Sequence, residues 1–347
     1  MPPDAHSPTL YAAAPGWLDA AISTVVSGGG TVFAPTATDN GAVQLAPTAS
    51  AATVKLDYVN NRLPLKTVFF PQTETLLRYK KAGDGSVDVT DAEMPPPEIL
   101  VLGCRPCDAA AMELLDTVFE WDYDDMPYRR RRENTTLVTF ACSEPGPQCF
   151  CSAVGGSPND ERGSDVLATL ATDGSAVLKS LTERGDRFVQ RLAAAVRPAT
   201  SSAAPQQAAP ALEPVDLQRV RAWLDNNFDN DLWAEVALRC LGCGICTYLC
   251  PTCHCFDIVD EAAWNHGERR RNWDSCAFRM FTLHASGHNP RPNQTARWRQ
   301  RVMHKFNYFP QRFGRAGCVG CGRCVEKCRA GQNLLDLLRR ISRENVS

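Results

Sequence analysis

The stretch CLGCGICTYLCP, from Cys240 to Pro251, decides the fold of the C-terminal half of the chain. Its four cysteines follow the spacing C-x2-C-x2-C-x3-C, and the run CVGCGRCVEKC, from Cys318 to Cys328, repeats it. This spacing wraps three thiolates around one iron–sulfur cube and sends the fourth thiolate to a neighbouring cube. The two runs therefore predict two [4Fe-4S] clusters in one ferredoxin-type domain.

The exchange of the fourth ligand assigns cysteines from both runs to each predicted cluster. Cluster 1 is expected on Cys240, Cys243, Cys246 and Cys328. Cluster 2 is expected on Cys318, Cys321, Cys324 and Cys250. Glycines between the cysteines allow the tight turns that such loops need: Gly242, Gly244, Gly320 and Gly322. The alternative is a pair of structural zinc sites, which also take four thiolates, although this spacing is unusual for zinc.

Composition limits the class of protein. The chain has 347 residues, which favours two domains, and its net charge of −2 gives no general attraction to nucleic acid or membrane. The N-terminus lacks the basic and apolar regions of a signal peptide, and no apolar run approaches the roughly 20 residues that span a bilayer. We therefore expect a cytoplasmic protein whose 16 cysteines are metal ligands in preference to disulfides.

The domain organisation follows from one break in composition. The segment PATSSAAPQQAAPALEP is rich in Ala, Pro, Ser and Gln and is predicted to be a linker over residues 198–214. We expect an α/β domain over 1–197 and a helical dicluster ferredoxin domain over 215–347. The expected fold class is α+β.

Hydrophobic periodicity predicts individual elements in both parts. In the N-terminal part we expect a helix over 17–26, buried strands over 98–103 and 136–142, and a hairpin around Asp173-Gly174. In the C-terminal part we expect helices, including one near the end of the chain over the sequence NLLDLLRRI.

Five further cysteines follow the two apparent strand ends of the N-terminal part: Cys104, Cys107, Cys142, Cys149 and Cys151. Because α/β domains place sites at the carboxyl ends of neighbouring strands, we expect four of these five to hold a third [4Fe-4S] cluster. The alternative is a set of scattered buried thiols.

Three cysteines remain outside these sets, and they are expected to be buried small side chains or neighbours of a cluster: Cys253, Cys255 and Cys276. His254 has no evident metal partner. The basic runs YRRRREN and ERRRNW are expected on solvated faces or paired with acidic side chains.

No dinucleotide fingerprint, phosphate loop, zinc-protease motif or nucleophile elbow occurs in the sequence. The chain offers clusters but no catalytic residues of its own. It is therefore expected to pass electrons between partner proteins.

The motifs CLGCGICTYLCPTCHCF, ERRRNWDSCAF, ASGHNPRP and CVGCGRCVEKC occur in that order. With CDAAAMELLDTVF, YRRRREN and CFC, they make the chain resemble the beta, iron–sulfur subunit of cytosolic sulfhydrogenases. These are group 3 [NiFe]-hydrogenases linked to NAD(P). In the third cluster, the resemblance implies the ligands Cys107, Cys142, Cys149 and Cys151, without Cys104. Arg329 departs from the family, which usually has proline there.

The resemblance implies a non-catalytic electron-transfer subunit of an oxidoreductase complex. Its partners would be a flavin subunit that oxidises or reduces NAD(P)H and the small and large subunits of a [NiFe]-hydrogenase. The electron-transfer subunit of anaerobic sulfite reductase resembles the chain in the same places and is the alternative. A self-contained thiol or cluster reductase is a further alternative, which a free cysteine pair such as Cys253 and Cys255 would favour.

Overall fold

The computed structural model describes residues 6–91, 95–192, 194–200 and 212–344. Contacts group the chain into two compact units, neither of which is one continuous segment. The N-terminal unit contains Met1–Leu65, Pro95–Glu213 and Val319–Cys321. The C-terminal unit contains Lys66–Met94, Pro214–Cys318 and Gly322–Ser347. Most of the predicted linker, 201–211, lies outside the described residues.

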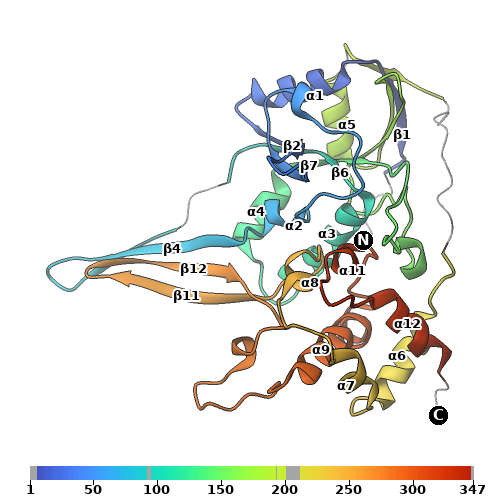
Figure 1. The fold of residues 1–347 in the computed structure, drawn as a ribbon. Helices are drawn as coiled ribbons and strands as arrows, with labels where there is room; N and C mark the ends of the chain where they lie inside the picture. The colour runs from blue at the N-terminus through green and yellow to red at the C-terminus, as the bar shows by residue number, and fades with distance from the viewer. Residues whose placement is uncertain (1–5, 92–94, 193, 201–211, 345–347) are drawn as a thin grey trace. The chain divides into compact units, whose positions relative to one another are not determined.

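The N-terminal unit is built on an eight-stranded sheet of order β10-β1-β9-β8-β7-β6-β2-β3 (Figure 1). Its strands are β1 (Thr9–Ala13), β2 (Thr31–Ala37), β3 (Val43–Pro47), β6 (Ile99–Cys104), β7 (Thr135–Phe140), β8 (Val166–Leu170), β9 (Ala176–Ser180) and β10 (Val196–Pro198). The four central strands β2, β6, β7 and β8 run parallel. The predicted strands β6 and β7 are direct neighbours, so their carboxyl ends lie at one edge of the sheet.

Helices cover the central strands of this sheet. They are α1 (Trp17–Val26), α3 (Pro106–Phe119), α4 (Met126–Glu133) and α5 (Glu183–Gln190). All six residues of β6 are buried, as is typical of parallel strands covered on both faces. One hydrophobic cluster joins α1 and α5 to alternate strand residues such as Leu100 and Leu102. Helix α3, whose buried side chains lie outside that cluster, packs on β7.

Two local predictions for this unit are confirmed, the helix over 17–26 and the hairpin around Asp173-Gly174. Helix α1 spans the predicted residues 17–26. Strands β8 and β9 form the predicted antiparallel hairpin, and Gly174 in its turn has a φ of 85°, a conformation that glycine adopts without steric penalty.

The C-terminal unit combines short helices with a four-stranded antiparallel sheet, which the expectation of a mostly helical C-terminal part did not include. The sheet order is β11-β12-β4-β5, with β4 (Thr73–Lys81), β5 (Val87–Asp91), β11 (Phe256–Ala263) and β12 (His266–Trp273). Figure 1 shows β4, β11 and β12 as a long ribbon. Helix and sheet content in both units confirms the predicted α+β class.

The pairing of β4 with β12 explains why residues 66–94 fold with the C-terminal unit. Glu74 lies opposite Arg271 in the ladder, and the Arg271 Nε donates to Glu74 Oε1 at 2.6 Å. Both side chains are almost fully buried. A charge buried in this way is tolerated only with its partner, so the pair fixes the register of the two strands.

The helices of the C-terminal unit are α2 (Lys66–Phe69), α6 (Leu217–Asn226), α7 (Leu232–Ala237), α8 (Ile245–Tyr248), α9 (Gln294–Met303), α10 (Phe309–Phe313), α11 (Arg323–Glu326) and α12 (Leu334–Arg343). A π-helical turn, His304–Tyr308, joins α9 to α10. Helix α12 confirms the predicted apolar periodicity, with Leu334, Leu337, Leu338 and Ile341 buried on one face. None of the described helices combines the length and apolarity that a bilayer crossing needs.

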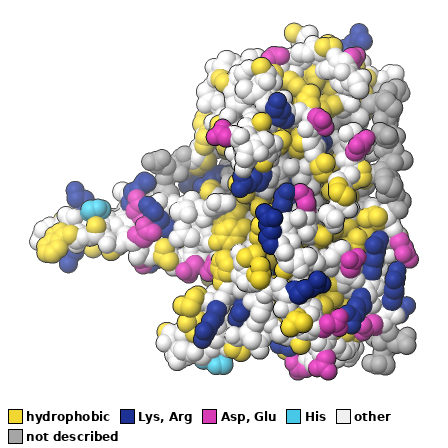
Figure 2. Space-filling view, viewed as in Figure 1, with side chains coloured by type: hydrophobic (Ala, Val, Ile, Leu, Met, Phe, Trp, Pro, Cys, Tyr) yellow, Lys and Arg dark blue, Asp and Glu magenta, His cyan; other side chains and the backbone are white. Residues whose placement is uncertain are grey.

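Both basic runs are paired with acidic side chains, as expected. Along the ribbon, Arg269 pairs with Asp260 and Arg270 pairs with Glu261 and Glu268. Figure 2 shows the resulting mixture of basic and acidic side chains over this ribbon. Carboxylates of the ribbon therefore balance the charge of both arginines.

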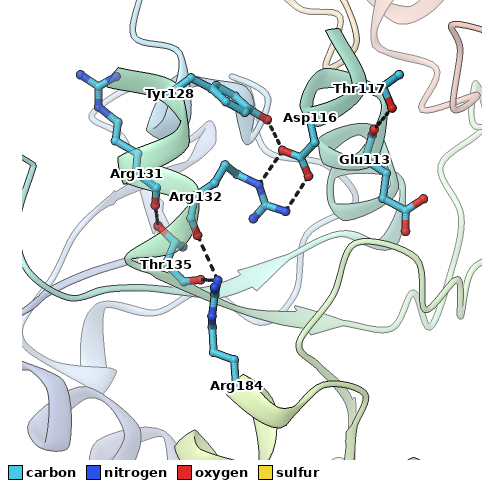
Figure 3. Close-up of polar contacts among 8 residues, drawn as sticks. All are labelled: Glu113, Asp116, Thr117, Tyr128, Arg131, Arg132, Thr135 and Arg184. Carbon is cyan, nitrogen blue, oxygen red and sulfur yellow. Dashed lines mark hydrogen bonds and ion pairs between the residues drawn. The ribbon is translucent and has the colours of Figure 1, made fainter. Parts of the chain in front are cut away.

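The run YRRRREN forms α4 and is anchored to α3 by Asp116 (Figure 3). Arg132 donates from Nε to Asp116 Oδ1 at 2.8 Å and from Nη2 to Oδ2 at 2.9 Å. The Tyr128 hydroxyl donates to the same Oδ1 at 2.6 Å. Arg184 donates to the carbonyl oxygens of Arg132 and Thr135, which ties α5 to the end of α4.

We predict that Asp116→Ala lowers the free energy of unfolding by about 2–3 kcal/mol, because Arg132 and Tyr128 lose their shared acceptor in a mostly buried place. Asp124→Ala removes an exposed partner of Arg129 and is the matched control, with an expected loss of about 0–1 kcal/mol. The measurement is urea unfolding of the full chain followed by circular dichroism. Equal effects of the two substitutions would contradict the anchoring role of Asp116.

Candidate iron–sulfur sites

Glycines begin the short helices that carry the cysteines of both runs. Helix α8 starts after Gly244 with φ 74°, and α11 starts after Gly322 with φ 76°. A Cβ atom at Gly244 would lie 2.6 Å from the Phe278 ring. The chain can therefore turn from loop to helix here only with glycine.

One cavity of the C-terminal unit is lined by all four cysteines predicted for cluster 1. They are Cys240, Cys243, Cys246 and Cys328, and Cys324 also reaches the wall. The last member comes from the second run, far along the chain from the other three. The crossing of the fourth ligand is therefore compatible with the geometry of this unit.

The same cavity has N–H donors for which the protein provides no acceptor. Arg301 and Trp298 line it, and Arg301 Nε, Arg301 Nη1 and Trp298 Nε1 are buried without a hydrogen-bond partner among the described residues. Gln294 Nε2 donates to Cys240 Sγ at 3.2 Å. Buried donors are normally satisfied, and an anionic cluster with sulfide acceptors would satisfy these. The residues of this cavity fit a [4Fe-4S] cluster.

A second set of thiols gathers around Lys305. Its Nζ donates to Cys250 Sγ at 3.3 Å and to the Gly317 carbonyl oxygen at 2.8 Å. Although burial acts to lower it, the neighbouring Cys250 thiolate raises the pKa of Lys305 above its usual value, and Cys318 adds to this effect. The C-terminal unit thus places two predicted ligands of cluster 2 beside one buried cation, while Cys321 belongs to the segment grouped with the N-terminal unit.

Another cavity, within the N-terminal unit, is lined by the four cysteines that the resemblance selected: Cys107, Cys142, Cys149 and Cys151. Cys107 lies in the first turn of α3, directly after β6, and Cys142 follows β7. Burial raises the pKa of Cys142 to about 11, and nearby Cys149 and Cys151 act in the same direction. Thiols crowded in this way are suited to a cationic group that would replace their protons.

Asn60 is a polar neighbour of the thiols in this cavity, whereas Cys104 lies outside it. Asn60 Nδ2 lies 3.7 Å from Cys149 Sγ and donates to the Cys321 carbonyl oxygen at 3.0 Å. Cys104 does not line the cavity, since its buried sulfur lies in β6, 3.4 Å from the Thr139 hydroxyl. The fifth cysteine is thus a core side chain.

The three remaining cysteines belong to the C-terminal unit. Cys253 is buried, and Cys255 and Cys276 are partly exposed. Burial of the His254 ring lowers its pKa to about 4, and its Nδ1 lies 3.2 Å from the Thr252 carbonyl oxygen. Among the described residues, no three His, Cys, Asp or Glu side chains are placed to hold a single metal ion.

The cysteine motifs did not indicate the donors Gln294, Arg301 and Lys305. A signal was present in the run RVMHKF, where Arg301 and Lys305 are four residues apart among apolar side chains. Basic residues at helical spacing inside an apolar helix need a buried anionic partner. This pattern could have indicated a helix facing the clusters.

We predict that Lys305→Gln lowers the reduction potential of the cluster that Cys250 is expected to bind. Loss of a buried positive charge disfavours the more negative reduced state, and the expected shift is roughly 50–100 mV for a charge about 7 Å away at an effective dielectric constant near 20. Potentiometric titration followed by EPR measures it.

Lys80→Gln is the matched control, because it removes the same charge from an exposed position on β4. It should leave the potential unchanged, since solvent screens that charge. An unchanged or raised potential in Lys305→Gln would contradict the placement of Cys250 as a ligand.

Comparison with known proteins agrees with this geometry. Residues 239–332 match the family model described as a 4Fe-4S dicluster domain, which indicates [4Fe-4S] clusters in this chain. The chain is 30% identical over 285 residues to sulfhydrogenase 2 subunit beta of Pyrococcus furiosus, covering 80% of this chain and 82% of the relative.

A solved F420-reducing [NiFe] hydrogenase complex from Methanosarcina barkeri contains a chain with 10% identity and a TM-score of 0.35. The match covers 59% of this chain and 84% of that one, and at this level of similarity it supports no inference. The match to the Pyrococcus protein extends through both units and confirms the resemblance seen in the sequence. The chain therefore belongs to the family of sulfhydrogenase beta subunits.

Proposed function

We propose that this chain is the iron–sulfur electron-transfer subunit of a [NiFe]-hydrogenase complex. It relays electrons between a flavin subunit that exchanges them with NAD(P)H and the small and large hydrogenase subunits. The observation that carries this proposal is the cavity shared by Cys328 and three cysteines of the first run. When bound, clusters in such cavities supply one-electron transfer.

The ligand sets proposed for the two ferredoxin-type clusters follow the crossed pattern. Cluster 1 is held by Cys240, Cys243, Cys246 and Cys328, and cluster 2 by Cys318, Cys321, Cys324 and Cys250. The roles of the chain's other residues are to donate hydrogen bonds and charge. Gln294 and Arg301 serve the first site and Lys305 serves the second, as their contacts with Cys240, Cys246 and Cys250 indicate.

A third cluster is proposed in the N-terminal unit on Cys107, Cys142, Cys149 and Cys151. The support is the cavity that these four thiols line. The segment 319–321, which contains the proposed cluster 2 ligand Cys321, also lines this cavity through Gly320 and Cys321. This proximity of the third site to the second ligand run favours an electron relay.

No residue of this chain is proposed to be catalytic. The sequence has no dinucleotide fingerprint, and twelve of its thiols are assigned to clusters. Oxidation of hydrogen and exchange with NAD(P)H are therefore assigned to the partner chains.

We predict that Cys149→Ser removes about four of the about twelve irons expected for three cubes in the anaerobically purified full chain. Cys104→Ser is the matched control, because Cys104 is buried near the same strand end but does not line the cavity, and its iron content should be unchanged. Iron and sulfide assays provide the measurement. A full complement of iron in Cys149→Ser would refute this ligand.

We predict that the isolated chain is reduced by dithionite but by neither NADH nor NADPH, because its sequence has no dinucleotide fingerprint. Addition of the flavin subunit should restore reduction by NAD(P)H, seen as bleaching of the broad cluster absorbance. Rapid bleaching by NADPH in a preparation free of flavin and partners would overturn the relay proposal.

A further inference from the structure

Part of the first ligand run lies at the surface of the C-terminal unit. Cys243 is exposed, and it lines the cavity proposed for cluster 1 together with Leu241. Leu241 is 72% exposed and Leu238 is 84% exposed. We propose that these three residues, with Arg239 and Arg329, form an exchange face where electrons pass between cluster 1 and an acidic redox protein. This inference rests on the proposed function and adds to it the place of contact and the charge of the partner.

The exposure of Cys243 distinguishes cluster 1 from the other two proposed clusters. Every other cysteine of the chain, all within the described residues, is buried or partly buried. Cys250 and Cys321, which are proposed ligands of cluster 2, are 7% and 8% exposed. Because the rate of electron transfer falls steeply with the distance between two centres, a partner exchanges electrons fastest with the cluster that it can approach most closely. Exposure therefore favours cluster 1 as the point of exchange.

Two segments that are far apart in the sequence meet at this face. Gln332 Nε2 donates to the Val236 carbonyl oxygen at 2.7 Å, which ties the chain after the second ligand run to the end of α7. Cys240 from the first run and Cys328 from the second line the same cavity. The residues next to these two cysteines therefore lie around one cavity.

The exchange face carries positive charge. Arg239 and Arg329 are each next to one of these cysteines in the chain, and both are exposed. Neither forms an ion pair with another residue that the structure describes. The segments 238–246 and 328–335 contain no Asp or Glu. The two guanidinium groups are thus available to carboxylates of a partner.

Apolar and basic side chains together suit contact with a protein. Interfaces combine apolar side chains with arginine, and contacts between electron-transfer proteins are often small. Complementary charge speeds the encounter and orients the partner, so we expect carboxylates around the partner's redox centre. In each encounter one electron leaves reduced cluster 1 and the partner's centre gains it, and no covalent bond forms or breaks.

The test measures electron transfer by stopped flow from the anaerobically purified full chain, reduced with dithionite and then freed of it, to an acidic flavodoxin. In Arg329→Glu the second-order rate constant at low salt should fall about tenfold, and added salt should shrink the difference. Arg221→Glu is the matched control, because Arg221 is exposed on α6 and does not line the cavity. Its rate constant should equal that of the unmodified chain.

The leucines are tested in the same way. Leu241→Ser should slow transfer to flavodoxin at every salt concentration, because it removes apolar contact and leaves the charge unchanged. Val89→Ser is its control, since Val89 is 60% exposed on β5 and does not line the cavity. Equal rate constants for these two variants would contradict the contribution of Leu241 to the face.

A basic cytochrome c as second acceptor separates charge complementarity from damage to the cluster. Arg329→Glu should not slow its reduction, because the new carboxylate attracts a basic partner. A changed potential cannot imitate this pattern, since a negative charge near cluster 1 lowers its potential and favours donation to both acceptors. Equal slowing with both acceptors would overturn the inference, as would slowing of flavodoxin reduction by Arg221→Glu as large as that by Arg329→Glu.

Failure of the proposed function would give a different result. A purified chain without iron would overturn both proposals. A chain with its full iron content whose transfer to flavodoxin is unaffected by Arg329→Glu would overturn the exchange face alone. These measurements need neither NAD(P)H nor hydrogenase subunits.

Discussion

The negative charge that thiolates bring into the interior is the constraint on which the C-terminal unit depends. Cysteine binds iron as an anion, and a buried anion needs hydrogen-bond donors and cations close by. Arg301 is 3% exposed and Lys305 is 4% exposed. Burial of these two positive charges is favourable only beside negatively charged thiolates. The thiolates in turn are stabilised by the two positive charges.

One continuous helical segment supplies these donors to the first ligand run. Gln294, at the start of α9, donates to the Cys240 sulfur, and Arg301 donates to the Cys246 carbonyl oxygen. Beyond Met303 the helix continues as a π-helical turn, in which Lys305 reaches Cys250. Such turns are frequent at functional sites because they reorient side chains locally. The segment therefore contacts cysteines that are predicted to bind two different clusters.

The N-terminal unit also places a cation and a hydrogen-bond donor near its buried cysteines, but it uses different residues. Its four thiols lie at the carboxyl ends of two parallel strands, where Arg105 is 5% exposed and donates to the carbonyl oxygens of Val59 and Ala141. This guanidinium lowers the pKa of Cys142 against the larger effect of burial. Asn60 adds an amide group close to Cys149. A buried cation and an amide thus accompany cysteines in both units, although the folds around them are unrelated.

Sequence alone determined the features that depend on short spacing. The two C-x2-C-x2-C-x3-C runs, the strands ending near Cys104 and Cys142, and the amphipathic helix α12 were all predictable, because local geometry sets these patterns. Tertiary structure decided the rest. The pairing of β4 with β12 through Glu74 and Arg271 joins residues far apart in the chain, and no local pattern encodes it.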